Sequence, residues 1–285
     1  MDAHEHSLAA DLEAMMNMQG DRRRSLRWLL AGAASLPLLG CGGAGDDGTV
    51  ATGTGTGTGS STGTGTGSSG SCTVIPEETG GPYPGDGTNS NASGIVNVLT
   101  QTGVVRSDIR SSFNGASGTA GGIPLTIKLK IVNANASCGV AGSFAVYLWH
   151  CDREGRYSLY SQGVTDQNYL RGVQAADADG NLTFTSIFPG CYDGRMPHIH
   201  FEVYRSLAQS TSAANRIKTS QFTFPLATMN EVYATAGYAS SASNLSRISF
   251  ASDNIFSDGY ALQLGTMSGN ATEGYVVTLS IAVAA

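Results

Sequence analysis

The chain has 285 residues, of which 16 are Lys or Arg and 22 are Asp or Glu, so its net charge is -6 at neutral pH. Nucleic-acid binders need clustered Lys and Arg, and an acidic chain with scattered basic residues argues against that class of function. A chain of this length can bury a substantial core, so any metal it binds serves function rather than the rescue of a small fold.

The N-terminal segment predicts export. Arg22, Arg23 and Arg24 precede an apolar run at residues 28–39 that is too short to span a bilayer and is followed by Gly40 and Cys41. The arginines resemble a twin-arginine signal, and the cysteine resembles the acylated residue of a lipoprotein. We therefore expect residues 1–41 to be an export signal, with a lipid anchor on Cys41 and a periplasmic or cell-surface location. A buried helix or a membrane span is the alternative.

Residues 42–71 consist mostly of Gly, Thr and Ser. Such a composition offers too little apolar surface to offset the entropy lost on ordering. A strand is the alternative, but glycine at every second position gives a sheet little to bury. This segment is predicted to be a flexible tether between the anchor and a domain at residues 72–285.

Strand patterns fill the remainder of the chain. Residues 124–132 alternate apolar and polar side chains with a period of two, which predicts a strand with one buried face. Further strands are expected at residues 144–149, 182–187, 199–204 and 275–283. There is no long helical period and no glycine-rich phosphate loop after a strand, which disfavours a nucleotide-dependent enzyme. The predicted fold is all-β, a β-sandwich of mainly antiparallel strands.

Four cysteines follow Cys41, namely Cys72, Cys138, Cys151 and Cys191. An even number in an exported chain predicts one or two disulfides, but four cysteines allow three complete pairings and the sequence does not choose among them. A structural zinc site is the alternative, although the close paired spacing of zinc ribbons is absent.

Two histidines, His198 and His200, lie one residue apart at the start of a predicted strand. Residues i and i+2 of a strand face the same way, so both imidazoles could bind one metal ion. The remaining histidine of the expected mature chain is His150. Because it is opposite in phase to Trp149, we interpret it as a hydrogen-bonded structural residue rather than a ligand.

Several segments carry a resemblance to a known family: Glu-Thr-Gly-Gly-Pro-Tyr at residues 78–83, Gly-Arg-Tyr at 155–157, Pro-Gly-Cys-Tyr at 189–192, and Arg-Met-Pro-His-Ile-His at 195–200. From about Cys72 to the C-terminus the chain resembles the intradiol ring-cleavage dioxygenases, whose members include protocatechuate 3,4-dioxygenase and catechol 1,2-dioxygenase. The short spacing of six residues between Tyr192 and His198 resembles the compact, exported branch of this family.

The resemblance implies a mononuclear non-haem Fe(III) site in loops and strand ends, with four metal ligands: Tyr157, Tyr192, His198 and His200. It also implies that Tyr192 leaves the metal when the substrate binds and takes up a proton, while Tyr157 stays bound. Arg195 is expected to stabilise negative charge on the ring, and Gln221 to help orient the substrate. Ferric iron favours anionic oxygen donors, so two phenolates with two imidazoles suit it.

The implied activity is insertion of O2 into catechol-type aromatic diols to give cis,cis-muconate-type diacids, a step in the catabolism of aromatic compounds. One alternative is a non-catalytic, lipid-anchored β-sandwich binding module. A second is a copper or zinc protein that uses the histidine pair with other ligands and needs neither tyrosine. The sequence predicts no particular oligomeric state.

Overall fold

The computed structural model describes residues 72–285. The predicted export signal, the anchor at Cys41 and the tether lie outside the described residues, so they stay predictions. None of the helices in the described part of the chain has the length and hydropathy of a membrane span.

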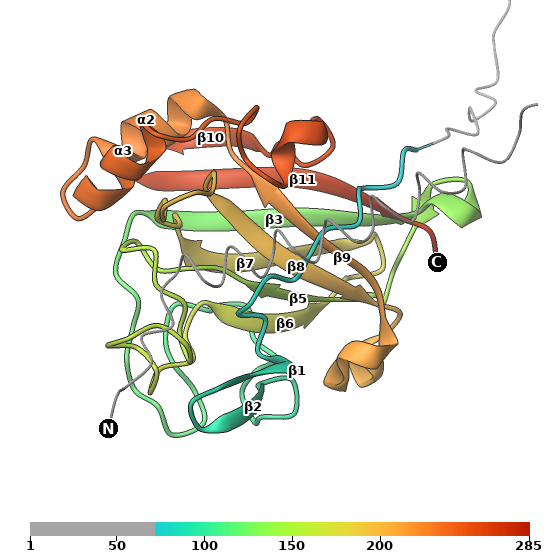
Figure 1. Cartoon of the computed structure of the whole chain (residues 1–285). Helices are drawn as coiled ribbons and strands as arrows, with labels where there is room; N and C mark the ends of the chain where they lie inside the picture. The colour runs from blue at the N-terminus through green and yellow to red at the C-terminus, as the bar shows by residue number, and fades with distance from the viewer. Residues whose placement is uncertain (1–71) are drawn as a thin grey trace, which may run out of the picture. The chain divides into compact units, whose positions relative to one another are not determined.

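Short strands dominate this part of the chain, with two short α-helices and several 3-10 helices between them (Figure 1). The strands are β1 (Asp86–Asn91), β2 (Gly94–Asn97), β3 (Pro124–Asn133), β4 (Gly139–Val140), β5 (Ala145–Trp149), β6 (Arg171–Ala175), β7 (Asn181–Ile187), β8 (His198–Tyr204), β9 (Arg216–Thr223), β10 (Thr266–Asn270) and β11 (Gly274–Val283). The helices are η1 (Ala134–Ala136), η2 (Leu207–Thr211), η3 (Ala213–Asn215), α2 (Leu226–Tyr233), α3 (Ala239–Leu245) and η4 (Phe256–Asp258).

Two sheets form a sandwich, which confirms the predicted fold class. One sheet has the order β10-β11-β3-β4 with β7 also paired to β3, and the other has the order β6-β5-β8-β9. Among the described strands, β11 and β3 run parallel, while the other paired strands run antiparallel. All five strands expected from the sequence are present, with ends shifted by at most one residue.

Alternation along the strands decides which side chains enter the core. In β3, Leu125 and Ile127 are buried whereas Lys128 is exposed, so this strand has one buried face as its sequence predicts. Strand β8 differs because every residue in it is buried. Its residues Ile199 and Phe201 belong to the core between the two sheets. The opposite face of β8 therefore lies inside the protein as well, under other segments of the chain.

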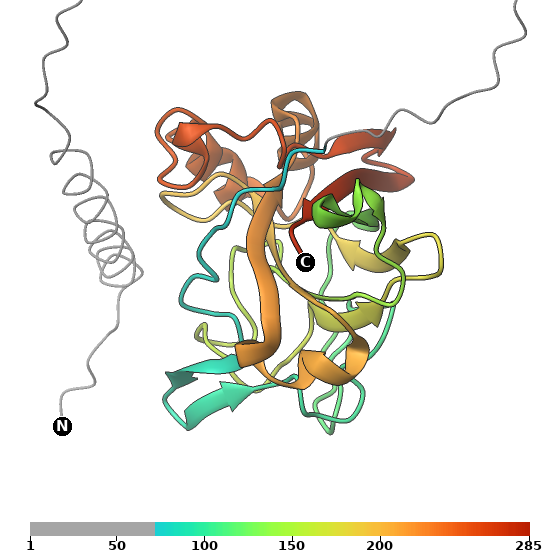
Figure 2. The same cartoon turned by 90° about the vertical axis from the view of Figure 1, so that its right-hand side faces the viewer.

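One covering segment is the stretch of residues 72–85, which we call the covering arm. It runs along β9 before it enters β1, as both views show (Figures 1 and 2). Glu78 N donates to Thr219 O at 2.9 Å, and Gln221 Nε2 donates to Thr79 O at 2.9 Å. These bonds hold the arm against the outer face of the sheet that contains β8.

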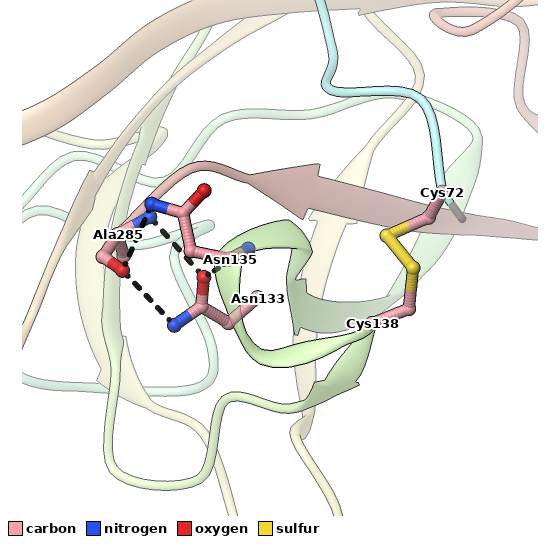
Figure 3. The surroundings of a disulfide bond; sticks show 5 residues. All are labelled: Cys72, Asn133, Asn135, Cys138 and Ala285. Carbon is pink, nitrogen blue, oxygen red and sulfur yellow. Dashed lines mark hydrogen bonds between the residues drawn. A yellow bond between two sulfur atoms is a disulfide. The ribbon is translucent and has the colours of Figure 1, made fainter. Parts of the chain in front are cut away.

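The start of the covering arm is fixed by a disulfide between Cys72 and Cys138 (Figure 3). The structure thus selects one pairing from the alternatives that the sequence left open. Cys151 and Cys191 are free thiols and both are buried. Of the one or two disulfides expected, the described residues form one.

Candidate metal centre

Strand register brings three side chains of the site into a row. His200 pairs with Trp149 of β5 on one side and with Gln221 of β9 on the other. The rings of Trp149 and His200 stack with centroids 4.9 Å apart and an interplanar angle of 3°. His198 lies two residues earlier on the same face of β8, so strand geometry alone places both imidazoles side by side.

The tautomer of His198 is set by a backbone group. Its Nδ1 lies 2.6 Å from Met196 O, and because a carbonyl only accepts, Nδ1 carries the proton and Nε2 presents a lone pair. Burial, reinforced by the charge of Arg195, lowers the pKa of His198 well below its ordinary value. Burial and the neighbouring His198 lower the pKa of His200 in the same way. Both rings are therefore neutral at neutral pH, as metal ligation requires.

Two phenols converge on the same nitrogen. The distance from His198 Nε2 to Tyr157 Oη is 3.4 Å, to Tyr192 Oη 3.2 Å, and to His200 Nε2 3.0 Å. Two donors that each lie about 2.1 Å from one cation at a right angle are about 3 Å apart. The observed separations match the spacing of ligands around a single metal ion.

The pair of imidazoles also contains an unsatisfied polar atom. His200 Nδ1 is buried and has no hydrogen-bond partner. A proton on its Nε2 would leave Nδ1 as an unpaired acceptor, whereas a proton on Nδ1 leaves two Nε2 lone pairs facing each other at the 3.0 Å separation from His198. A cation between the donors removes that repulsion, so these residues fit a metal ion.

Close contact between two loops positions the phenols. Tyr157 lies in the loop between β5 and β6, and Tyr192 lies in the loop between β7 and β8. Where the loops meet, a Cβ on Gly155 would lie 2.9 Å from Tyr192 Cβ, and one on Gly190 would lie 2.6 Å from Arg153 O. Glycine is required at both crossings because any side chain would push the two tyrosines apart.

The protonation state of the two phenols depends on whether a cation lies between them. Burial raises the pKa of Tyr157 well above its ordinary value, and the neighbouring Tyr192 adds to this. Burial raises the pKa of Tyr192 to about 12, with Arg195 acting in the opposite direction. Without a nearby cation both phenols keep their protons, whereas a highly charged metal ion would favour the phenolates.

Arg195 is 1% exposed and held by two side chains. Its Nε donates to Asp253 Oδ2 at 3.0 Å, and its Nη2 donates to Gln221 Oε1 at 2.7 Å. Gln221 is in turn fixed by its bond to Thr79 O of the covering arm. The structure thus brings together all six residues singled out in the sequence, and it adds Asp253, which no local sequence signal marks.

The surrounding side chains restrict the type of metal. Within residues 72–285, no group of three or more His, Cys, Asp or Glu residues is arranged to hold a metal ion. His150 is hydrogen bonded as predicted, with Nδ1 2.8 Å from Cys151 O and Nε2 2.6 Å from Ser186 Oγ. A metal at the histidine pair would therefore need the tyrosine oxygens, which argues against the copper or zinc alternative.

Comparisons with known proteins agree with this picture. A family model described as Dioxygenase matches residues 105–210, a segment that includes both tyrosines and both histidines of the site. A search of curated proteins gives no match. An intradiol ring-cleavage dioxygenase from Tetranychus urticae is similar in structure, with a TM-score of 0.58 and 23% identity over 75% of this chain and 95% of that one. Another dioxygenase crystal structure gives a TM-score of 0.57 and 24% identity, with the same coverage.

The two solved structures share the β-sandwich fold with this chain. Because they are less than 25% identical to it, the fold is all that this similarity shows. The family match shows that residues 105–210 are similar to a dioxygenase family model. Together they confirm the resemblance to intradiol ring-cleavage dioxygenases that the sequence predicts.

Proposed function

We propose that this protein is an Fe(III)-dependent intradiol dioxygenase that inserts O2 into catechol-type aromatic diols and forms cis,cis-muconate-type diacids. The observation that carries the proposal is the convergence of two phenol oxygens and two imidazole nitrogens, with three of them within 3.4 Å of His198 Nε2. The dioxygenase family match over the same residues supports it.

Four residues would hold the metal: Tyr157, Tyr192, His198 and His200. Two phenolates and two neutral imidazoles form a donor set suited to ferric iron, because this hard cation prefers anionic oxygen ligands. When bound, Fe(III) supplies Lewis-acid polarisation of the catechol oxygens and accepts electron density from the ring. The net charge of the centre is then small enough for a buried site.

The two tyrosines differ in exposure, which supports different roles for them. Both lie in loops, but Tyr157 is 2% exposed, whereas Tyr192 is only half-buried. The more exposed residue, Tyr192, is the one that can swing away and accept a catechol proton on its Oη. Tyr157 is packed against Tyr83, with ring centroids 5.0 Å apart, and would stay in place.

Arg195 and Gln221 would act as fixed hydrogen-bond donors toward negative charge on the ring. Their own contacts hold them before any substrate arrives, so little reorganisation is needed during the reaction. The covering arm limits access of water, because a Cβ on Gly81 would lie 3.5 Å from His200 Cε1. A side chain at this position would occupy space beside the histidine pair.

The experiment that tests the proposal uses the full-length protein loaded with Fe(III). We expect a visible tyrosinate-to-Fe(III) absorption band that shifts when catechol is added without oxygen, and a ring-opened diacid once O2 is admitted. Tyr157→Phe should abolish the band or prevent iron binding. Tyr275→Phe is the matched control, because Tyr275 is a buried tyrosine of β11 in the core between the sheets.

A colourless protein that binds catechol without consuming O2 would contradict the proposal and favour the non-catalytic binding module. A band that survives Tyr157→Phe and is lost in the control would contradict the ligand assignment.

We also propose that the protein is exported and anchored through a lipid on Cys41. Cys41→Ala should then move it from the membrane fraction to the soluble fraction of cells.

A further inference from the structure

Asp253 lies in the loop before η4, and its side chain is 0% exposed. Its carboxylate accepts four hydrogen bonds. Oδ2 accepts from Arg195 Nε at 3.0 Å and from Met196 N at 2.7 Å. Oδ1 accepts from the backbone N of Ile255 at 2.8 Å and of Phe256 at 3.0 Å. One buried carboxylate thus links this loop to the segment that leads into β8.

The link continues to the metal ligand His198. Met196 donates its backbone N–H to Asp253 and accepts the Nδ1 proton of His198 on its carbonyl at 2.6 Å. The position of Met196 therefore fixes the tautomer and the ring orientation of His198. A hydrogen bond to the second nitrogen of a ligating histidine is the usual means of setting both properties.

Helix η4, which follows this loop, also contacts Arg195 and His198 through its first residue, Phe256. Its ring lies 5.9 Å from Arg195 Cζ and 6.5 Å from the ring centroid of His198. Because the Asp253 carboxylate accepts a hydrogen bond from the backbone N of Phe256, it also holds the Phe256 ring beside Arg195 and His198. Hydrogen bonds and ring contacts thus join the loop and η4 to the segment before β8.

Charge gives a further reason for a carboxylate at this position. Arg195 is almost fully buried, and burying a guanidinium is unfavourable unless hydrogen bonds or an anionic partner offset its lost hydration. Asp253 forms an ion pair with it at 3.0 Å. Neither the strand pattern nor the histidine motif calls for an acidic residue 58 positions after Arg195.

We propose that Asp253 is the positioning residue of the site, which holds Arg195 toward the substrate and, through Met196, holds His198 toward the metal. This inference rests on the proposed function, because it takes His198 as a metal ligand and Arg195 as a donor to the substrate. Asp253 itself touches neither the metal nor the substrate.

Asp253→Asn is the test, since it keeps the shape and removes the charge. All four hydrogen-bond partners of the Asp253 carboxylate are N–H donors, two on each oxygen. The NH2 group of an Asn side chain would therefore face one of these pairs and could accept from neither donor. In the iron-free, full-length protein, 15N NMR of the imidazoles should show His198 only as the Nδ1–H tautomer. In Asp253→Asn both tautomers should appear, and the affinity for Fe(III) should fall about 10 to 100-fold.

Two controls isolate the role of the carboxylate. Asn254→Ala changes the neighbouring side chain, which has no hydrogen-bond partner, and should leave the tautomer and the iron affinity unchanged. Gln221→Ala removes the other partner of Arg195 but not the bond between Met196 and His198, so His198 should stay in the Nδ1–H form. Asp253→Glu, which keeps the charge but moves it, should give a smaller loss than Asp253→Asn.

Near-ultraviolet circular dichroism establishes that each variant is folded. A folded Asp253→Asn or Asp253→Glu protein with His198 wholly in the Nδ1–H form and the iron affinity of the wild type would overturn the inference. Failure of the proposed function gives a different pattern, because the wild type itself would then bind no iron. The tautomer comparison is made without iron, so it still decides the role of Asp253 in that case.

Discussion

The buried Arg171 of β6 offers the sharpest test of how this site is supported. It is 1% exposed and donates five hydrogen bonds, all to neutral oxygens. The acceptors are Pro84 O at 2.8 Å, Tyr83 O at 2.9 Å, Ser158 O and Ser158 Oγ at 3.0 Å, and Tyr147 Oη at 3.2 Å. Arg171 thus joins the end of the covering arm to the residue that follows Tyr157.

Arg171→Met keeps an apolar stem of similar length but leaves three backbone carbonyls without this donor. Pro84 O keeps its hydrogen bond from Tyr147 Oη at 2.6 Å, so two carbonyls lose a buried partner at a cost of about 1–3 kcal/mol each. The two lost bonds to hydroxyl oxygens add about 0.5–1.5 kcal/mol each, which gives a gross loss of about 3–9 kcal/mol. Removing the guanidinium also returns its desolvation cost, which is several kcal/mol. We expect a net loss of about 3 kcal/mol in the free energy of unfolding, in the range of the larger single-site effects.

Urea unfolding measures this change. With an m value of about 2 kcal/mol/M, the midpoint should fall by about 1.5 M while m stays constant. Arg110→Met is the control, because Arg110 forms an exposed ion pair with Asp108 and its loss should cost under about 0.5 kcal/mol. An Arg171→Met protein within about 1 kcal/mol of the wild type would refute the reasoning, since the lost hydrogen bonds would then be worth no more than ordinary surface contacts.

Three further predictions concern pH, the disulfide and the loop crossing. Burial raises the pKa of Glu202 from 4.5 to about 8. Because the folded state keeps a proton that the unfolded state releases, stability should fall as the pH rises through this window, and Glu202→Gln should flatten the dependence in urea unfolding at several pH values. The disulfide joins cysteines 66 positions apart, and replacing both Cys72 and Cys138 by Ala should cost about 4 kcal/mol in the free energy of unfolding. Gly155 has a φ of +84°, and its Cβ would lie 2.9 Å from Tyr192 Cβ, so Gly155→Ala should weaken the visible band of the iron-loaded protein.

A control for the glycine substitution lies in the same loop. Gly163 has a φ of +83°, but the nearest atom to its Cβ would be Arg156 Nη1 at 3.8 Å. Gly163→Ala therefore carries the same backbone strain without the contact, and it should lower stability while leaving the band intact. Equal effects of Gly155→Ala and Gly163→Ala on the band would show that strain, not displacement of Tyr192, is responsible.

Local patterns in the sequence determined the class of fold and the centre of the site. A period of two in β3 and β11 requires strands with one buried face, because successive side chains on a strand point to opposite sides. The same rule places His198 and His200 on one face of β8 whatever the remainder of the chain does. The motifs around Tyr157 and Tyr192 indicated the remaining donors through family resemblance, and the structure brings all four residues together.

The tertiary structure alone decided what surrounds those four residues. It chose the pairing of Cys72 with Cys138, and it brought Asp253 to Arg195 across 58 positions and Arg171 to Pro84 across 87. Periodicity in a sequence reports only on neighbours within one strand or helix, whereas these contacts depend on how the loops and the covering arm cross the outer face of a sheet. Short motifs thus predict the candidate metal ligands, whereas the residues that hold those ligands in place are brought together only by the folded chain.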